Sequence, residues 1–374
     1  MRSVRFLTQG LVLAAVLAGC GDEDKESEAG VSRVALGTFT TDADGGVDVP
    51  VDVPDTAVSA LLYCGPYTYD VLATAERITD PGGAAVYDFN DPAGTPMRVL
   101  NHDDMLPVLI PVSPDLPLTS GGWTVRVYVD STSPATVDCN ALYRIDEAAP
   151  SQSVDIRFVF VGVDGEVPGL NAAEGDTNEA LSATVTRVGQ LWADAGFSVG
   201  EISYEDFSGD VATYNSVDGP EELGNLQRTV SDVGNREIVY FLVSAITDAD
   251  GATILGLAAG PPGLAAVGAT SKSGVVASVG SLVDGNTDEM ARILAHEGMH
   301  FMGLFHTSEK DGSLYDPIAD TAECTTDADG NGTLSASECG GSGADNLMWW
   351  SASETSTSLS ADQAWVVQRS AAAH

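Results

Sequence analysis

Three of the five histidines in the chain lie close together, at positions 296, 300 and 306. His296 and His300 are spaced i and i+4, so a helix would project both imidazoles from one face toward one ion. We expect Gly303 to end that helix in a left-handed turn, which returns His306 to the same ion. Three protein ligands leave a fourth position for water, and this is the arrangement of a catalytic zinc site.

Glu297 follows His296 directly and lies beside the face that carries the two imidazoles. From there its carboxylate reaches a metal-activated water and not the metal itself, which suits a general base. We expect the helix to be capped by Asn286, with Glu289 three residues later. The alternatives are a chance match and a purely structural metal, but neither explains the added glutamate, glycine and third histidine.

The series His296-Glu297-x-x-His300-x-x-Gly303-x-x-His306 resembles the zinc-binding signature of the metzincin metallopeptidases at every fixed position. That family also has a tight turn whose methionine lies beneath the imidazoles, and Met348, within residues 345–350, resembles it. The likeness covers roughly residues 152–374 and implies a zincin catalytic domain, a twisted mixed sheet with an active-site helix. It also implies a zinc metalloendopeptidase that hydrolyses peptide bonds through a metal-activated water, with Glu297 as general base.

Two positions depart from the family pattern. In some metzincins a tyrosine two residues after the methionine steadies the oxyanion, but this chain has Trp350 there. Thr307, directly after the third histidine, matches no subfamily marker, and the nearest group is pappalysin-like. Metzincins hold the substrate along an edge strand above the site, and the resemblance assigns that strand to Gly274–Val279.

The segment 327–338 matches the twelve-residue EF-hand loop at its diagnostic positions, including Gly332 at the sixth. Calcium takes about six to eight oxygen ligands. The candidate ligands here are Asp327, Asp329, Asn331, Thr333, Ser335 and Glu338. The flanking Cys324 and Cys339 would replace the usual helices as a clamp. The alternative is an acidic surface loop that fits the pattern by chance.

Residues 1–19 combine a short basic segment with an apolar stretch too short to span a bilayer, which is typical of an export signal. Leu17-Ala18-Gly19-Cys20 resembles the lipobox of bacterial lipoproteins. The resemblance implies cleavage before Cys20 and a lipid on its thiol, hence a protein anchored in the bacterial cell envelope, at the outer membrane or cell surface. An ordinary signal peptide is the alternative. Residues 21–30 are polar and charged with nothing to bury, which predicts an acidic tether over residues 20–35.

Four cysteines remain after Cys20, an even number that suits disulfide bonds in an exported chain. Three pairings are possible. We favour Cys64 with Cys139 and Cys324 with Cys339, because each pair then lies within one expected domain. In the alternative, a Cys64 thiolate caps the metal, but this would leave Cys139 unpaired.

The pattern of apolar residues predicts two domains. Residues 36–148 show short alternating runs between turn signals, typical of a small all-β sandwich, with strands at Val58–Cys64, Ala84–Phe89 and Trp123–Val129. From residue 152 onward strands alternate with helices, which predicts an α+β domain over 152–374. Its expected strands are Val154–Val163, Ser198–Tyr204, Ile238–Val243 and Val275–Val279. Its expected helices are Asp176–Ala195, Glu221–Val230 and one that begins with a capping box at Ser360 and Gln363.

The charge of the chain limits its partners. It has 374 residues, with 16 Lys and Arg against 55 Asp and Glu, for a net charge of −39. A nucleic-acid binder needs a basic face, so that class is excluded, and the membrane would be contacted through the lipid anchor only. The sequence therefore predicts a monomeric peptidase with zinc and calcium that acts on proteins or peptides. The alternative is a surface lipoprotein with a binding role and a latent or vestigial zinc domain.

Overall fold

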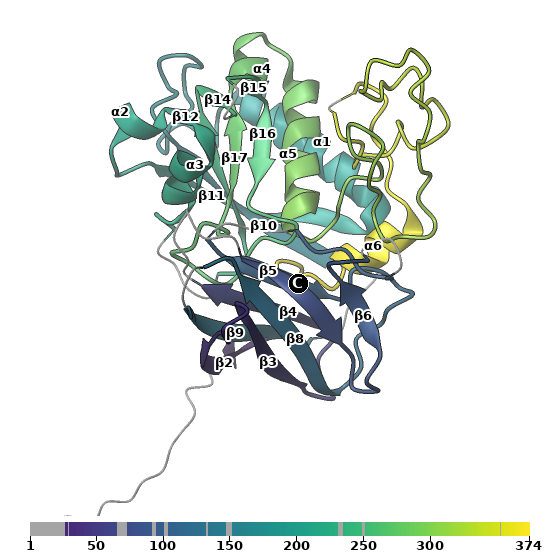
Figure 1. Cartoon of the computed structure of the whole chain (residues 1–374). Coiled ribbons are helices and arrows are strands. Elements are labelled where there is room, and N and C mark those ends of the chain that lie inside the picture. The colour runs from purple at the N-terminus through teal and green to yellow at the C-terminus, as the bar shows by residue number, and fades with distance from the viewer. Residues whose placement is uncertain are drawn as a thin grey trace, which may run out of the picture.

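The computed structural model describes residues 27–28, 30–65, 73–91, 95–100, 104–131, 134–146, 152–230, 235–248, 251–351 and 353–374 (Figure 1). The export signal, Cys20 and much of the predicted tether lie outside the described residues. In the part of the chain that is described, no helix is both long and apolar enough to cross a bilayer.

Regular structure in the described residues from 27 to 146 consists of strands, which form two antiparallel sheets (Figure 1). The five-stranded sheet has the order β1-β2-β9-β4-β7, with β1 (Ser27–Glu28), β2 (Val31–Thr40), β9 (Thr136–Arg144), β4 (Ser59–Gly65) and β7 (Leu106–Ile110). The four-stranded sheet has the order β3-β8-β5-β6, with β3 (Gly46–Val53), β8 (Gly121–Val129), β5 (Ala73–Thr79) and β6 (Ala85–Asp88). Alternate side chains of β3 and β8 are buried, as period-two patterning requires, and join those of the other sheet in one core.

The structure contains both of the favoured disulfide bonds. Cys64 on β4 lies directly opposite Cys139 on β9, and the two are joined. Cys324 is joined to Cys339 across the predicted calcium loop. Cys64 is therefore not available as a thiolate, and the alternative in which it caps a metal is wrong.

Beyond residue 152 the protein is mixed α+β. Its main sheet has the order β11-β10-β13-β17-β16, with β11 (Phe197–Asp206), β10 (Gln152–Phe160), β13 (Ile238–Val243), β17 (Val275–Ser278) and β16 (Gly256–Ala258). The first four strands are parallel to their neighbours, and β16 pairs antiparallel to β17. A small three-stranded sheet has the order β12-β14-β15, with β12 (Ser216–Asp218), β14 (Ala245–Thr247) and β15 (Thr253–Ile254).

Helices cover both faces of the main sheet. The helices of this part are α1 (Glu179–Trp192), the 3-10 turn η2 (Ala193–Ala195), α2 (Val211–Tyr214), α3 (Gly219–Gln227), α4 (Gly280–Val283), α5 (Thr287–Phe301) and α6 (Ala361–Val367). The α5 side is fixed by Tyr240 of β13, whose hydroxyl donates to the Leu294 carbonyl at 2.8 Å. Residues of α3, including Leu223 and Leu226, pack in a second apolar cluster with Val239 and Phe241, on the opposite face of β13. The capping box expected at Ser360 and Gln363 is present at α6.

The N-terminal sheets and the α+β part share one buried apolar core. At Gly303, just past the end of α5, an added Cβ would lie 2.4 Å from a methyl of Leu109 on β7. Arg144 at the end of β9 has a fully buried side chain, which donates to the carbonyls of Gln368 and Ser370 beyond α6 and pairs with Asp146 at 2.6 Å. The junction is therefore both packed and hydrogen-bonded.

Replacing Arg144 tests how much this junction contributes to stability. Arg144→Met removes the donors that satisfy two carbonyls at a buried junction, so we expect the free energy of unfolding to fall by about 1–3 kcal/mol. Arg77→Met is the control, because the Arg77 side chain is 58% exposed and only pairs with Asp88. Chemical denaturation measures both variants, and equal small losses would contradict the prediction.

Candidate metal centre

Helix α5 carries the first two predicted metal ligands, and its boundaries agree with the sequence. The Asn286 side chain accepts from the Glu289 N–H at the start of the helix. After Phe301 the chain turns at Gly303, whose φ of 114° lies in the left-handed region. The indole of Trp192 on α1 donates to the Ala295 carbonyl at 3.2 Å and joins this part of α5 to α1.

The structure brings His296, His300 and His306 together. One ring nitrogen of each lies within 4.8 Å of those of the other two. The Nε2 atoms of His300 and His306 are 3.0 Å apart. Nitrogens bound to one tetrahedral zinc at about 2.0–2.1 Å would be separated by about 3.3 Å, so the spacing suits a single ion.

The other nitrogen of each ring is already hydrogen-bonded. Nδ1 of His296 contacts the Leu347 carbonyl at 2.7 Å, and Nδ1 of His300 contacts the Leu304 carbonyl at 2.6 Å. Nδ1 of His306 contacts the Glu309 carboxylate at 2.9 Å.

These partners define the tautomers. Carbonyl and carboxylate oxygens only accept, so each Nδ1 carries the proton and each Nε2 presents a lone pair. Two lone pairs that face each other at 3.0 Å between His300 and His306 repel unless a cation lies between them. The donor set therefore fits a metal ion.

Burial keeps the imidazoles of His296 and His300 on α5 neutral. It lowers the pKa of His296 to about 3, and the nearby His306 acts in the same direction. Burial, with the neighbouring imidazoles, also lowers the pKa of His300 well below its usual value. Neutral imidazole is the form that binds metals.

Glu297 is buried on α5 beside the histidines and points its carboxylate at β16. Its Oε2 accepts the Ala258 N–H at 2.7 Å. Burial raises the pKa of this carboxyl to about 7, against the effect of that hydrogen bond. Gly256 makes the approach of β16 possible, because a Cβ there would lie 2.9 Å from Cγ of Glu297.

A cleft of about 380 Å³ opens above these groups and is walled by three separate parts of the chain. Leu257 and Ala258 of β16 line one side, and Trp350 lines another. Arg98 and Leu100, from the segment between β6 and β7, complete the lining. The N-terminal part therefore contributes directly to the candidate site, which its sequence pattern gave no reason to expect.

The strand expected to hold substrate was misplaced. Gly274–Val279 corresponds to β17, which lies inside the sheet between β13 and β16. The edge strand beside Glu297 is β16 (Gly256–Ala258). A strand of three residues with two glycine or alanine positions carries too little pattern to be recognised in the sequence.

The turn that contains Met348 lies next to the histidines. Leu347 provides the carbonyl for His296, and the Met348 carbonyl accepts the Thr307 N–H at 3.1 Å. Met348 is fully buried. The Trp350 indole donates to the Leu334 carbonyl at 2.8 Å, so this polar atom is already occupied.

Sequence reasoning missed Glu309 and Arg98. Burial acts to raise the pKa of Glu309, but the hydrogen bond with His306 and the charge of Arg98 outweigh it and lower the pKa to about 2. Arg98 donates to Glu309 Oε1 at 2.6 Å. The position of Glu309, three residues after His306, was a local signal for a partner of that ligand. Arg98, 211 residues away from Glu309, gave none.

Three of the predicted calcium ligands also lie together. Carboxylate oxygens of Asp327, Asp329 and Glu338 are within 4.8 Å of one another. Asp327 accepts the Gly330 N–H at 2.8 Å, and Glu338 accepts the Ala328 N–H at 2.9 Å, so the loop closes on itself.

The other three predicted ligands lie on the same loop. Asn331 donates to Asp329 at 2.9 Å and accepts the Thr333 N–H at 2.7 Å. The Ser335 hydroxyl donates to Glu338 at 2.7 Å. The candidate calcium loop is thus a compact, exposed group of oxygen atoms.

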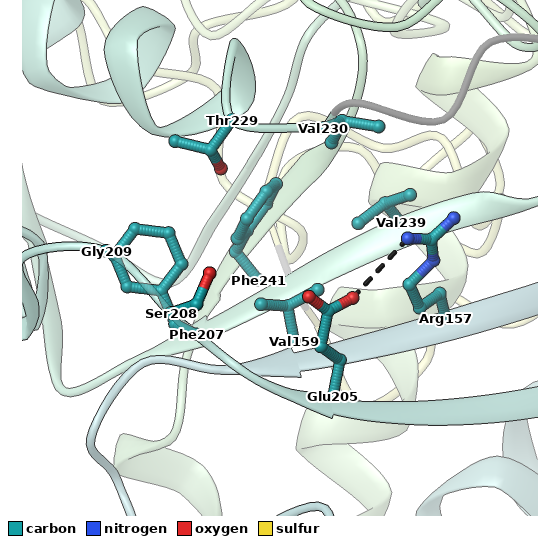
Figure 2. Close-up of a pocket in the computed structure, with 10 residues that line it drawn as sticks. All are labelled: Arg157, Val159, Glu205, Phe207, Ser208, Gly209, Thr229, Val230, Val239 and Phe241. Atoms are coloured by element: carbon teal, nitrogen blue, oxygen red, sulfur yellow. Dashed lines mark hydrogen bonds and ion pairs between the residues drawn. The ribbon is translucent and has the colours of Figure 1, made fainter.

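Figure 2 shows a second hollow, of about 240 Å³, on the face of the sheet away from α5. Val159 and Phe241 contribute apolar surface to it, and Arg157 faces Glu205 at 3.4 Å across one side. Arg157 also pairs with Glu237. The ten residues that line this hollow include no histidine or cysteine, so they do not offer the metal-ligating chemistry of the first cleft.

Gly256→Ala tests whether the close approach of β16 positions Glu297. The added methyl would displace Glu297 and Ile293, so we expect kcat/KM for peptide hydrolysis to fall by about 100-fold while the metal content is unchanged. Gly122→Ala on β8 is the control, because nothing lies within 4 Å of a Cβ there. Steady-state kinetics and metal analysis are measured on both variants. Wild-type kinetics in Gly256→Ala would show that the close approach of β16 does not position Glu297.

Comparisons with known proteins leave the family unassigned. No family model and no curated protein matches the chain. Among solved structures, it is similar to metalloproteinase-II from Bacteroides fragilis, with 16% identity and a TM-score of 0.27. The alignment covers 50% of this chain and 60% of that one, so the chain spans less than two thirds of that structure. A likeness this distant does not place the chain in a family.

Proposed function

We propose that the protein is a zinc metalloendopeptidase of the metzincin type. The observation that carries the proposal is the set of three convergent Nε2 atoms with every Nδ1 hydrogen-bonded, next to the carboxylate of Glu297. A zinc ion bound there would supply Lewis acidity, polarising the scissile carbonyl and lowering the pKa of water. His296, His300 and His306 would hold the ion, and their neutral rings suit it.

Glu297 is the proton carrier in this proposal. The Ala258 N–H fixes its Oε2, which leaves Oε1 to take the proton of the attacking water. The same carboxyl then delivers that proton to the leaving amine, so peptide cleavage needs no covalent enzyme intermediate.

The substrate in this proposal is an extended peptide that lies along β16. This strand pairs with β17 on one side, and Ala258 next to Glu297 brings its backbone to the cleft. A peptide added at such an edge gains main-chain hydrogen bonds, which are independent of its sequence. Met348 would support the imidazoles from the turn below, as in the metzincins.

Calcium is proposed as a structural ion in the loop 327–338. This loop contacts the cleft wall through Leu334, whose N–H donates to the Lys310 carbonyl at 2.7 Å and whose carbonyl accepts from Trp350. Oxygen-rich loops of this pattern bind calcium. We further propose that a lipid on Cys20 anchors the exported protein in the cell envelope.

Glu297→Gln tests the catalytic assignment. The amide oxygen can still accept from Ala258, but the side chain can no longer take a proton, so we expect kcat to fall at least about 1000-fold with zinc still bound. Peptide-pool cleavage and zinc analysis are measured on the same samples. An unchanged phenotype together with retained zinc would favour the alternative of a surface-binding lipoprotein.

Calcium removal tests the loop assignment. Without calcium, the wall formed by Trp350 loses its support, and we expect kcat/KM to fall several-fold, about 3–10-fold, while zinc is retained. Glu338→Gln should give the same loss in saturating calcium, whereas Glu354→Gln, an exposed substitution outside the loop, should not. Activity that is independent of free calcium in the wild type would contradict a structural calcium.

A further inference from the structure

The third histidine is the least constrained of the three candidate ligands. His296 and His300 project from α5, and their Nδ1 atoms are bonded to backbone carbonyls. His306 follows the helix on irregular chain, and its Nδ1 partner is the side chain of Glu309. A glutamate side chain has rotatable bonds of its own, so it positions an imidazole well only if something else fixes it.

Arg98 holds the Glu309 carboxylate by the oxygen that does not face His306. Its Nη2 donates to Glu309 Oε1 at 2.6 Å, while Glu309 Oε2 faces His306 at 2.9 Å. The Arg98 side chain is only 13% exposed, so water competes little for this pair.

The same guanidinium contacts the chain on both sides of His306. It lies 4.6 Å from the centroid of the Phe305 ring, directly before the histidine. Its Nη1 donates to the Tyr315 carbonyl at 3.1 Å. Tyr315 forms an antiparallel bridge with Ser308, which closes the loop of residues 309–314 that begins with Glu309. One guanidinium therefore contacts both this loop and the Phe305 ring.

We propose that Arg98 is a positioning residue of the metal centre: through Glu309 it orients His306, so the N-terminal part of the chain completes the metal site. The proposal rests on the proposed function only in that the three histidines bind zinc. If Arg98 only formed a salt bridge, a contact with Glu309 would be sufficient. The planar fork that reaches Glu309, Tyr315 and Phe305 together is instead the geometry that arginine supplies and lysine does not.

The experiment measures zinc affinity of the full chain by competition with a chromophoric chelator, and the visible absorption of the cobalt-substituted protein. Arg98→Met removes the charge and the fork, and we expect zinc affinity to fall about tenfold or more, with a changed cobalt spectrum. Arg98→Lys keeps the charge without the fork and should show a smaller loss. Arg77→Met is the matched control, because it removes an exposed ion pair of the N-terminal sheets and should leave both readouts unchanged.

A double-mutant cycle makes the test specific. If Arg98 acts through Glu309, then Arg98→Met combined with Glu309→Gln should bind zinc no more weakly than the weaker single variant. Additive losses would overturn the proposal. So would wild-type affinity and a wild-type cobalt spectrum in Arg98→Met. Thermal unfolding of the metal-free variants identifies any variant that is misfolded. If Arg98→Met is misfolded, the same cycle of zinc affinities is measured with Arg98→Lys and Glu309→Gln, and that cycle decides between the two outcomes.

The readouts separate this proposal from the proposed function. A wild-type chain that binds zinc and cleaves no peptide overturns the peptidase assignment and leaves the affinity test of Arg98 intact. A wild-type chain that binds neither zinc nor cobalt overturns both.

Discussion

The candidate metal centre depends on one constraint: an imidazole can offer Nε2 to an ion in a fixed direction only if its Nδ1–H is held by an acceptor. In this protein the three acceptors come from three places, namely Leu304 beyond α5, Leu347 in the turn before α6, and Glu309 in the turn between them. The chain from residue 302 to 350 must therefore close correctly around α5 before the ligand set exists. The helix alone provides two rings without defined orientations.

This dependence explains why irregular chain surrounds the site. The disulfide between Cys324 and Cys339 packs in a small apolar cluster with buried Leu334, Ala344 and Trp349. The hydrogen bond from Trp350 to the Leu334 carbonyl joins the neighbouring chain to it. Such a cluster replaces the secondary structure that this region lacks, because it limits the conformations available to the segment that supplies Glu309 and Leu347.

Sequence alone predicted the elements whose information is local. The spacing of His296, His300 and His306, the cap at Asn286 and the turn at Gly303 are all encoded within a short window, and the structure has each of them. The order of strands is not local. Buried runs such as β13 and β17 look alike whether they lie inside a sheet or at its edge, and the true edge strand β16 is only three residues long. Arg98 could not be found at all, because a single arginine between two strands carries no periodicity.

Several of the few basic residues of this acidic chain lie where its parts meet. Arg98 joins the N-terminal segment to Glu309 at the candidate metal centre, while Arg144 and Arg236 hold the carbonyls of the last residues and share Asp146. With a net charge of −39, each such cation also reduces repulsion among the surrounding carboxylates. Because the Arg98, Arg144 and Arg236 side chains are at most 13% exposed, salt screens these pairs much less than it screens exposed charges.

The shared core has a consequence for how the chain could mature. Leu109 packs against the end of α5, and Arg144 is enclosed by the residues that follow α6. A protease that cut the chain between β9 and β10 would nick the molecule without releasing a fragment, because separation would expose apolar surface on both pieces. The N-terminal sheets are therefore expected to stay bound to the α+β part and not to act as a detachable leader.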